Sequence, residues 1–212
     1  MIVMAAECKT IYVDLDDVLC QAARHFLMIV ERVFGKKIGF AQLTNFDVGY
    51  SCGLTPVECD ELYRIVHLPD ELMSMEPIGE AVQVLTKWAE RGYEIAIVTG
   101  RPPWCDEVSR AWLANHRIPH HSFTVVDKYS RFPPESTGAI SLRDLAGRRF
   151  CWAVEDSLPM ARYLTGEMRV PVALLDRPWN QCVEEEGIVR CPDWKAIDAA
   201  KLICAMVFGG TR

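Results

Sequence analysis

The stretch Thr10-Ile11-Tyr12-Val13-Asp14-Leu15-Asp16-Asp17-Val18-Leu19 decides the fold. Its apolar, β-branched start is typical of a buried strand, and it leads directly into three acids within four positions. Side chains at i and i+2 of a strand point to the same side, so Asp14 and Asp16 can face one site. Acids at the end of a buried strand are costly unless a cation lies with them. An acidic, solvated turn explains these ten residues equally well, so the rest of the chain decides.

Composition limits the class of protein. The chain has 212 residues, half of them hydrophobic, which suits one α/β domain with an insertion. Its net charge of −6 disfavours duplex nucleic acid and anionic membranes as partners, because binding to these relies on Lys and Arg. A small phosphorylated substrate needs only a few local cations and remains compatible with this charge. The oligomeric state stays open, with a homodimer as one alternative.

The sequence also favours a cytoplasmic location. No apolar run approaches the ~20 residues of a membrane-spanning helix. The start, Met1 to Ala6, lacks the basic region of a signal peptide. The nine cysteines are scattered, and Cys182 and Cys191, expected in one loop, lack paired metal-binding spacing. We therefore expect buried or free thiols in a reducing cytoplasm.

The chain beyond Leu19 divides into a helical stretch and an alternating stretch. Residues 20–77 contain helical patterns and irregular segments but no strand, so they predict a small helical insertion. From Ile78 onward, helices alternate with apolar strands, which predicts a parallel sheet covered on both faces. The expected organisation is a Rossmann-like α/β core, residues 1–19 and 78–212, interrupted by a helical segment, residues 20–77.

The expected elements follow from periodicity and from helix start and stop signals. Helices are expected at Cys20–Phe34, Thr55 to about His67, Asp70–Met75, Ile78–Arg91, Trp104–His116, Ser157–Leu164 and Asp193–Val207. Further strands are expected at Glu94–Val98, Ser122–Val126, Arg148–Val154 and Val170–Leu175, with a loop at Arg131–Ala139.

Four of these strands end in polar groups of different kinds. In chain order they are Asp14 with Asp16, then Thr99, then Lys128, then Glu155 with Asp156. The carboxyl ends of parallel strands lie along one edge of the sheet, where open α/β folds bind ligands. The four groups are therefore expected to converge, although they lie far apart in the sequence.

The residue types indicate phosphoryl chemistry. Asp14 and Asp156 brought together would repel unless a divalent cation lies between them, and oxygen ligands suit Mg²⁺. Mg²⁺ and Lys128 can neutralise a phosphate dianion, and Thr99 with nearby backbone N–H groups can bind its oxygens. A carboxylate nucleophile splits hydrolysis into two steps, and Asp16 is placed to protonate the leaving oxygen and then activate water.

Each of these residues also has a structural alternative. Thr99 can satisfy the backbone at a strand end, Arg131 can supply the charge in place of Lys128, and Asp156 can cap the following helix. Phe46 can stack on a nucleobase or pack inside the insertion. Arg101 can contact substrate or form a surface salt bridge.

Asp14-Leu15-Asp16-Asp17-Val18, Thr99, Lys128 and Glu155-Asp156 resemble the four motifs of the haloacid-dehalogenase-like hydrolases. The resemblance implies Asp14 as nucleophile, Asp16 as acid/base and a helical cap after the first motif. It implies that the metal is held by Asp14, the Asp16 backbone carbonyl and Asp156, with Glu155 as a further ligand or a neighbour of one. Asp16 argues against carbon–halogen chemistry.

A narrower resemblance is to the cytosolic 5′(3′)-deoxyribonucleotidase group. It rests on Leu43-Thr44-Asn45-Phe46-Asp47, on Leu175-Asp176-Arg177-Pro178-Trp179-Asn180, and on Arg190 with Asp193-Trp194. The candidate substrate-binding residues are Thr99, Gly100, Arg101, Lys128 and Phe46.

The sequence is therefore compatible with three functions. The first is a Mg²⁺-dependent phosphatase for a small monoester such as a nucleoside monophosphate, in the 5′(3′)-(deoxy)ribonucleotidase manner. The second is a phosphatase for a sugar phosphate or other metabolite. The third is a non-catalytic binding protein on the same fold, against which the complete set of motif residues argues.

Overall fold

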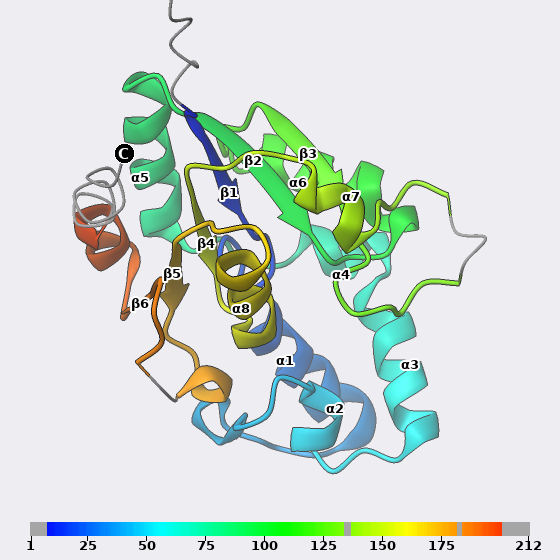
Figure 1. Cartoon of the computed structure of the whole chain (residues 1–212). Helices are drawn as coiled ribbons and strands as arrows, with labels where there is room; N and C mark the ends of the chain where they lie inside the picture. The colour runs from blue at the N-terminus through cyan, green and yellow to red at the C-terminus, as the bar shows by residue number, and fades with distance from the viewer. Residues whose placement is uncertain (1–7, 134–136, 182–183, 201–212) are drawn as a thin grey trace, which may run out of the picture.

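A computed structural model describes residues 8–133, 137–181 and 184–200. It contains a six-stranded sheet in the order β3-β2-β1-β4-β5-β6, and every neighbouring pair is parallel. The predicted α/β class and parallel sheet are confirmed, with β1 beside β2 and β4 as in Figure 1. The strands are β1 Thr10–Val13, β2 Glu94–Thr99, β3 Ser122–Val125, β4 Trp152–Glu155, β5 Val172–Leu175 and β6 Ile188–Cys191.

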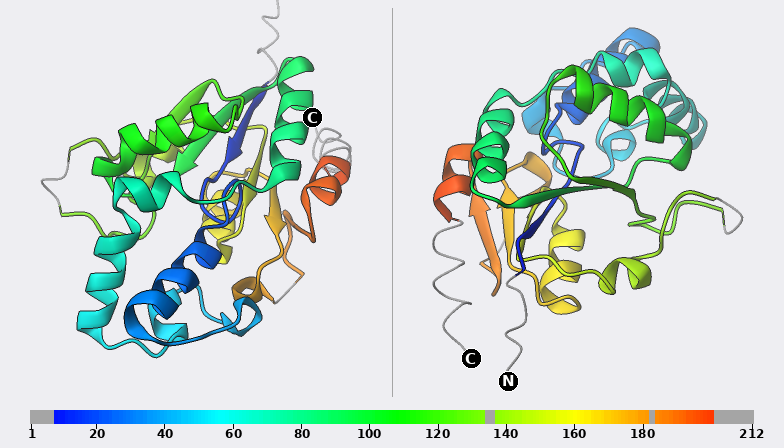
Figure 2. Two further views of the ribbon diagram at one scale, coloured as in Figure 1. Left: turned by 180° about the vertical axis from the view of Figure 1, so that it is seen from behind. Right: turned by 90° about the horizontal axis from the view of Figure 1, so that it is seen from above.

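Helices cover both faces of this sheet (Figure 2, right). On one face, α5 (Gly79–Glu90), α6 (Asp106–Asn115) and helical residues 194–200 pack on side chains such as Ile11 and Val13. On the other face, α7 (Leu142–Ala146) and α8 (Leu158–Gly166) pack on residues that include Tyr12. The alternation of β1 side chains between two cores is what a strand buried on both faces requires.

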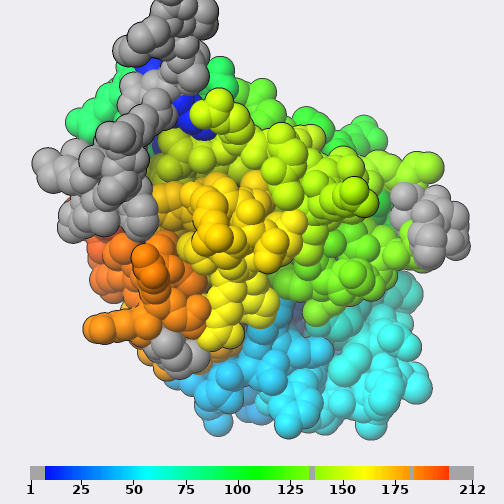
Figure 3. Space-filling model, in the orientation of Figure 1, coloured from blue at the N-terminus to red at the C-terminus, as the bar shows by residue number. Residues whose placement is uncertain are grey.

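Helices and turns fill residues 20–77, as predicted, and lie beyond the carboxyl ends of the strands (Figure 1). Many of their buried apolar residues form a third cluster, whereas Cys20, Ala22, Leu72 and Met75 belong to the cluster that covers one face of the sheet. In the space-filling view this segment forms the blue-to-cyan lobe at one end of the molecule (Figure 3). Its elements are α1 Ala22–Phe34, the 3₁₀ turn η1 Phe40–Gln42, α2 Val48–Ser51, α3 Pro56–Val66 and α4 Pro69–Met73.

The two ends of segment 20–77 lie side by side. The Gln21 amide donates to the Glu76 carbonyl at 2.9 Å, and the Ile78 amide donates to the Leu19 carbonyl at 2.7 Å. Cys20 and Pro77 form an isolated antiparallel bridge between these two bonds. The chain therefore leaves and re-enters the sheet layer at one point.

Several element predictions need correction. Residues around Cys191 were expected in a loop, but Ile188–Cys191 form the edge strand β6 beside β5. β4 begins at Trp152 rather than at Arg148, and two 3₁₀ turns, η2 (Pro103–Cys105) and η3 (Pro178–Asn180), were not predicted. The predicted last helix is present over residues 194–200, and its remainder, with Cys182, lies outside the described residues. Among the described helices, none is long and apolar enough to span a membrane.

Candidate active site

The register of the sheet brings the first and fourth motifs together. Val13 lies opposite Val154, and the Asp14 amide donates to the Val154 carbonyl at 3.0 Å. Asp14 is therefore next to Glu155 and Asp156 where the two central strands end. All three acids are buried, with exposed fractions of 7%, 0% and 3% respectively.

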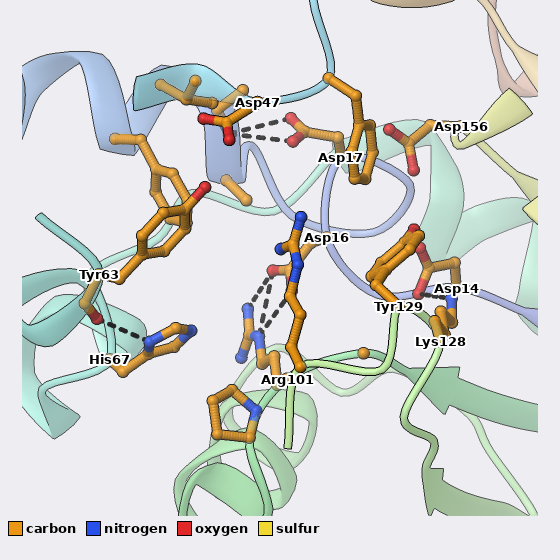
Figure 4. Close-up of a pocket in the computed structure, with 18 of the residues that line it drawn as sticks. Asp14, Asp16, Asp17, Asp47, Tyr63, His67, Arg101, Lys128, Tyr129 and Asp156 are labelled. Atoms are coloured by element: carbon orange, nitrogen blue, oxygen red, sulfur yellow. Dashed lines mark hydrogen bonds and ion pairs between the residues drawn. The ribbon is translucent and has the colours of Figure 1, made fainter. Parts of the chain in front are cut away.

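Lys128 is the cation inside this acidic group. Its Nζ lies 2.8 Å from Asp14 Oδ1 and 2.7 Å from Glu155 Oε1, and its side chain is only 1% exposed. Gly100 leaves room for the aliphatic part of the Lys128 side chain, because a Cβ at position 100 would lie only 3.3 Å from Lys128 Cδ. Figure 4 shows Lys128 beside Asp14, with Tyr129 adjacent.

The carboxylates are suited to a metal ion. Oxygens of Asp14, Glu155 and Asp156 all lie within 4.8 Å of one another. Burial, together with the charge of Glu155, raises the pKa of Asp14 to about 8 despite Lys128. Burial and the charges of Glu155 and Asp14 raise the pKa of Asp156 well above its ordinary value. A divalent cation among these oxygens would offset the repulsion between the carboxylates, which adds to the effect of burial in both shifts.

Glu155 is occupied by protein donors. Its Oε1 accepts from Lys128 Nζ at 2.7 Å and from the Tyr12 hydroxyl at 2.8 Å. Its Oε2 accepts from the amides of Asp156 and Ser157, each at 3.1 Å. These four bonds leave Asp14 and Asp156 as the carboxylates with oxygens to offer an ion, and they make Glu155 the anchor of Lys128.

Asp16 has a different partner. The Arg101 guanidinium binds it with Nη2 2.6 Å from Oδ1 and Nε 3.0 Å from Oδ2. The Arg101 side chain is 3% exposed and the Asp16 side chain 34%. Burial alone would raise the pKa of Asp16, but the charge and hydrogen bonds of Arg101, with the Cys20 thiol, lower it below its ordinary value. The close-up shows this pair in the middle of the site (Figure 4).

Thr99 ends β2 and is fully buried. Its hydroxyl accepts the Arg101 amide at 3.1 Å, which shapes the turn that carries Gly100 and Arg101. Thr99 and Glu155 are the two predicted site residues that do not line the cavity above the strand ends.

That cavity has a volume of about 600 Å³ and is bounded by the sheet edge and by segment 20–77. Seven predicted site residues line it: Asp14, Asp16, Phe46, Gly100, Arg101, Lys128 and Asp156. Aromatic rings contribute from several elements, and Phe46 packs on Tyr129 with ring centroids 5.4 Å apart. Tyr63 and His67 face the cavity from α3 and the residue after it (Figure 4).

Several lining residues were not predicted as site residues. Tyr129 directly follows the motif residue Lys128, and Trp179 lies within the stretch Leu175–Asn180 that resembles the deoxyribonucleotidase group. His67 gave no signal, because a lone histidine at a helix end has no distinguishing pattern. Its Nδ1 lies 2.7 Å from the Tyr63 carbonyl, and burial lowers its pKa.

A family model and a relative among known proteins are similar to this chain. The family model described as "5' nucleotidase, deoxy (Pyrimidine), cytosolic type C protein" matches residues 8–132, more than half of the chain. The chain is 22% identical over 188 residues to "Putative nucleotidase BH1399" of Halalkalibacterium halodurans, which covers 88% of this chain and 89% of that protein.

Two solved structures share the fold. Protein Tyrosine Kinase A (PtkA) of Mycobacterium tuberculosis superposes with a TM-score of 0.66 at 12% identity, over 92% of this chain and 99% of that one. The hydrolase SP0104 of Streptococcus pneumoniae, a haloacid dehalogenase-like family protein, superposes with a TM-score of 0.60 at 11% identity, over 92% and 98%. At these identities the likeness concerns the fold alone.

With motif residues, sheet order and family match in agreement, the chain belongs to the cytosolic type C 5′-nucleotidase family of the haloacid-dehalogenase-like hydrolases and is a phosphoric monoester hydrolase.

Proposed function

We propose that this chain is a Mg²⁺-dependent phosphatase that hydrolyses a small phosphate monoester through an aspartyl phosphate on Asp14. The observation that carries the proposal is the buried Asp14 carboxylate, held between Lys128 and Asp156 at the edge of the cavity. A strong nucleophile and the charges that a phosphate dianion needs are thereby adjacent.

Asp14 and Asp156, with the backbone carbonyl of Asp16, would hold the ion. Their oxygen-only chemistry and the raised pKa of both side chains favour a hard divalent cation such as Mg²⁺. When bound, the ion supplies positive charge that offsets the charge of the substrate phosphate.

The chain's own residues carry the two steps. An Asp14 oxygen bonds to phosphorus while the bond from phosphorus to the leaving oxygen breaks, and Asp16 gives that oxygen a proton. Asp16 then takes a proton from water, which attacks phosphorus, releases inorganic phosphate and restores Asp14. Lys128 offsets charge on the transferring oxygens, and the turn at Thr99 and Gly100 offers amide donors to them.

For the substrate we propose a 5′(3′)-(deoxy)ribonucleotide, with residues 20–77 acting as the cap that covers it. Aromatic side chains that line the cavity, among them Phe46 and Tyr129, which pack on each other, suit the flat face of a base. The family description supports the nucleotide over a sugar phosphate, and its term "cytosolic" supports the cytoplasm as the compartment.

A phosphate-release screen with Mg²⁺ over nucleoside monophosphates and sugar phosphates tests the substrate. We expect the highest kcat/KM on a nucleotide and no turnover after chelation with EDTA. Preference for a sugar phosphate would replace the substrate proposal and leave the phosphatase chemistry in place. Absence of release from every compound would favour a binding protein instead.

Two substitutions test the mechanism. Asp14→Asn preserves the shape but removes the nucleophilic charge, so turnover should fall by ~10⁴-fold or more, while beryllofluoride should label Asp14 alone in the unmodified protein. Asp16→Asn should slow an alkyl phosphate ~10²-fold or more and p-nitrophenyl phosphate far less, because a good leaving group needs little protonation. Full activity of folded Asp14→Asn would falsify the covalent mechanism. Equal losses on both substrates would remove Asp16 from the acid/base role.

A further inference from the structure

The segment that follows β5 reaches the proposed metal site from outside the four motifs. Asn180 Nδ2 donates to the Asp156 carbonyl at 2.7 Å and to the Leu175 carbonyl at 2.9 Å, which fixes η3 against the end of β5. Arg177 Nε donates to the Asp17 carbonyl at 3.0 Å. This one short segment therefore contacts the backbone of both the first and the fourth motif.

Trp179, in the middle of η3, contacts a side chain of the site itself. Its indole Nε1 donates to Asp156 Oδ2 at 2.9 Å. Asp156 is 3% exposed, so this oxygen has little access to solvent. One oxygen of the carboxylate is thus fixed by the indole, which leaves Oδ1 as the oxygen to offer an ion.

The indole is itself held by segment 20–77. Its ring meets Phe40 of η1 edge to face, with centroids 5.7 Å apart and planes at 74°. Phe40 is also in contact with the Arg24 guanidinium of α1, which lies 4.1 Å from the ring centroid. Trp179 also packs against the buried cluster of that segment. Contacts with segment 20–77, which lies across the cavity from the sheet, therefore fix the position of the indole N–H that donates to Asp156.

We propose that Trp179 is a positioning residue for the Mg²⁺ site, holding the Asp156 carboxylate in the orientation that presents Oδ1 to the ion. The inference rests on the proposed function, because it assumes that Asp156 binds the ion. Hydrogen bonds from outside the ligand set orient metal-binding side chains, and their loss typically costs ~10–100-fold in metal affinity. A buried carboxylate has few other donors with which to replace the indole.

The test is calorimetric titration of MgCl₂ into the substrate-free protein and into Trp179→Phe. Phenylalanine keeps an aromatic ring next to Phe40 but removes the N–H donor, together with part of the volume of the indole. We expect the Mg²⁺ dissociation constant to rise about tenfold, the lower end of the range for such partners. The lowered activity of Trp179→Phe at low MgCl₂ should recover as the MgCl₂ concentration is raised, because the proposed loss is one of metal affinity.

Trp104→Phe is the matched control for metal affinity. Trp104 lines the same cavity and is 69% exposed, and its change should leave the Mg²⁺ dissociation constant unaltered. A second measurement needs no variant: the indole N–H signal of Trp179 in an NMR spectrum should shift on addition of Mg²⁺, because its acceptor becomes a ligand.

The outcomes separate the two proposals. If the unmodified protein takes up no Mg²⁺, the proposed function fails and this inference fails with it. If it binds Mg²⁺ and folded Trp179→Phe binds equally well, or the indole signal does not respond to Mg²⁺, only the positioning role is overturned.

Discussion

At the scale of single residues, Asp14 has to be ionised to act, yet its surroundings favour its neutral form. Burial and Glu155 raise the pKa of Asp14 to about 8, and Lys128 only partly opposes them. Mg²⁺ must therefore displace a proton to bind below that pH. Between pH 6 and pH 8 we expect the Mg²⁺ affinity to rise by up to about tenfold per pH unit for each proton that the ion displaces. Above pH 8 the affinity should level off.

Calorimetry in buffers of different ionisation enthalpy measures the number of protons released when Mg²⁺ binds, because proton release adds a buffer-dependent heat. The sign is fixed by the raised pKa of Asp14: lowering the pH protonates the ligand and weakens binding. An affinity that is constant between pH 6 and 8, with no proton release, would contradict the prediction.

The pair of Asp16 and Arg101 acts in the opposite direction. Although burial favours the neutral acid, Arg101 lowers the pKa of Asp16. The ionised Asp16 carboxylate is better suited to activating water than to protonating a leaving group. Arg101→Gln should raise that pKa, because it removes the opposite charge and the hydrogen bonds that lower it.

The measurement is the pH profile of alcohol release from an alkyl phosphate in a single turnover. Release by a general acid declines above the pKa of that acid, so the decline should begin at a higher pH in Arg101→Gln. Arg110→Gln, which removes an exposed pair with Asp106, is the control and should leave the profile in place. Superimposable profiles for Arg101→Gln and the unmodified protein would show that Arg101 does not set the proton affinity of Asp16.

At the scale of elements, the sequence was sufficient wherever a local signal and a buried pattern coincided. The start of α3 is an example, because Thr55 and Glu58 form the capping box and Pro56 occupies the first turn. β1 and β2 are apolar runs buried on both faces, and both were predicted within one residue of their ends.

Short elements without such signals were missed. β6 follows an acidic run and Gly187. Among the described strands it pairs with β5 alone, so its strand conformation depends on the open edge of β5. α7 is a helix of five residues. It has a capping box, Ser141 with Asp144, but its apolar pattern is too short to predict a helix. Tertiary contact rather than local preference decides elements of this length.

The candidate site, too, was predictable from the sequence only in part. The parallel arrangement of the strands made the convergence of Asp14, Lys128 and Asp156 predictable, because the carboxyl ends of parallel strands share one edge. The bonds from Arg101 to Asp16 and from Trp179 to Asp156 were not predictable. They depend on the directions of long side chains from elements whose spacing only the folded chain determines.

At the scale of the whole molecule, the part of segment 20–77 from α1 to α3 has a buried cluster of its own, which includes Leu62 and Val30. The end of the segment differs, because Leu72 and Met75 pack in the cluster on the face of the sheet. A part with its own core can lose structure locally while the sheet persists.

Leu62→Ala tests this independence. Leu62 is fully buried in the cluster of segment 20–77, so its truncation should cost about 2–5 kcal/mol through lost burial and the cavity that remains. Native-state hydrogen exchange should show that loss in the amides of α1 and α3, while amides of β1 and β4 keep their protection. Leu85→Ala is the matched control, because Leu85 is equally buried but lies in the cluster under the sheet, and its loss should appear in β1 and β4. An equal fall in protection across the sheet and the segment for Leu62→Ala would mean that the two unfold as one, and that the segment cannot open over the cavity without the sheet.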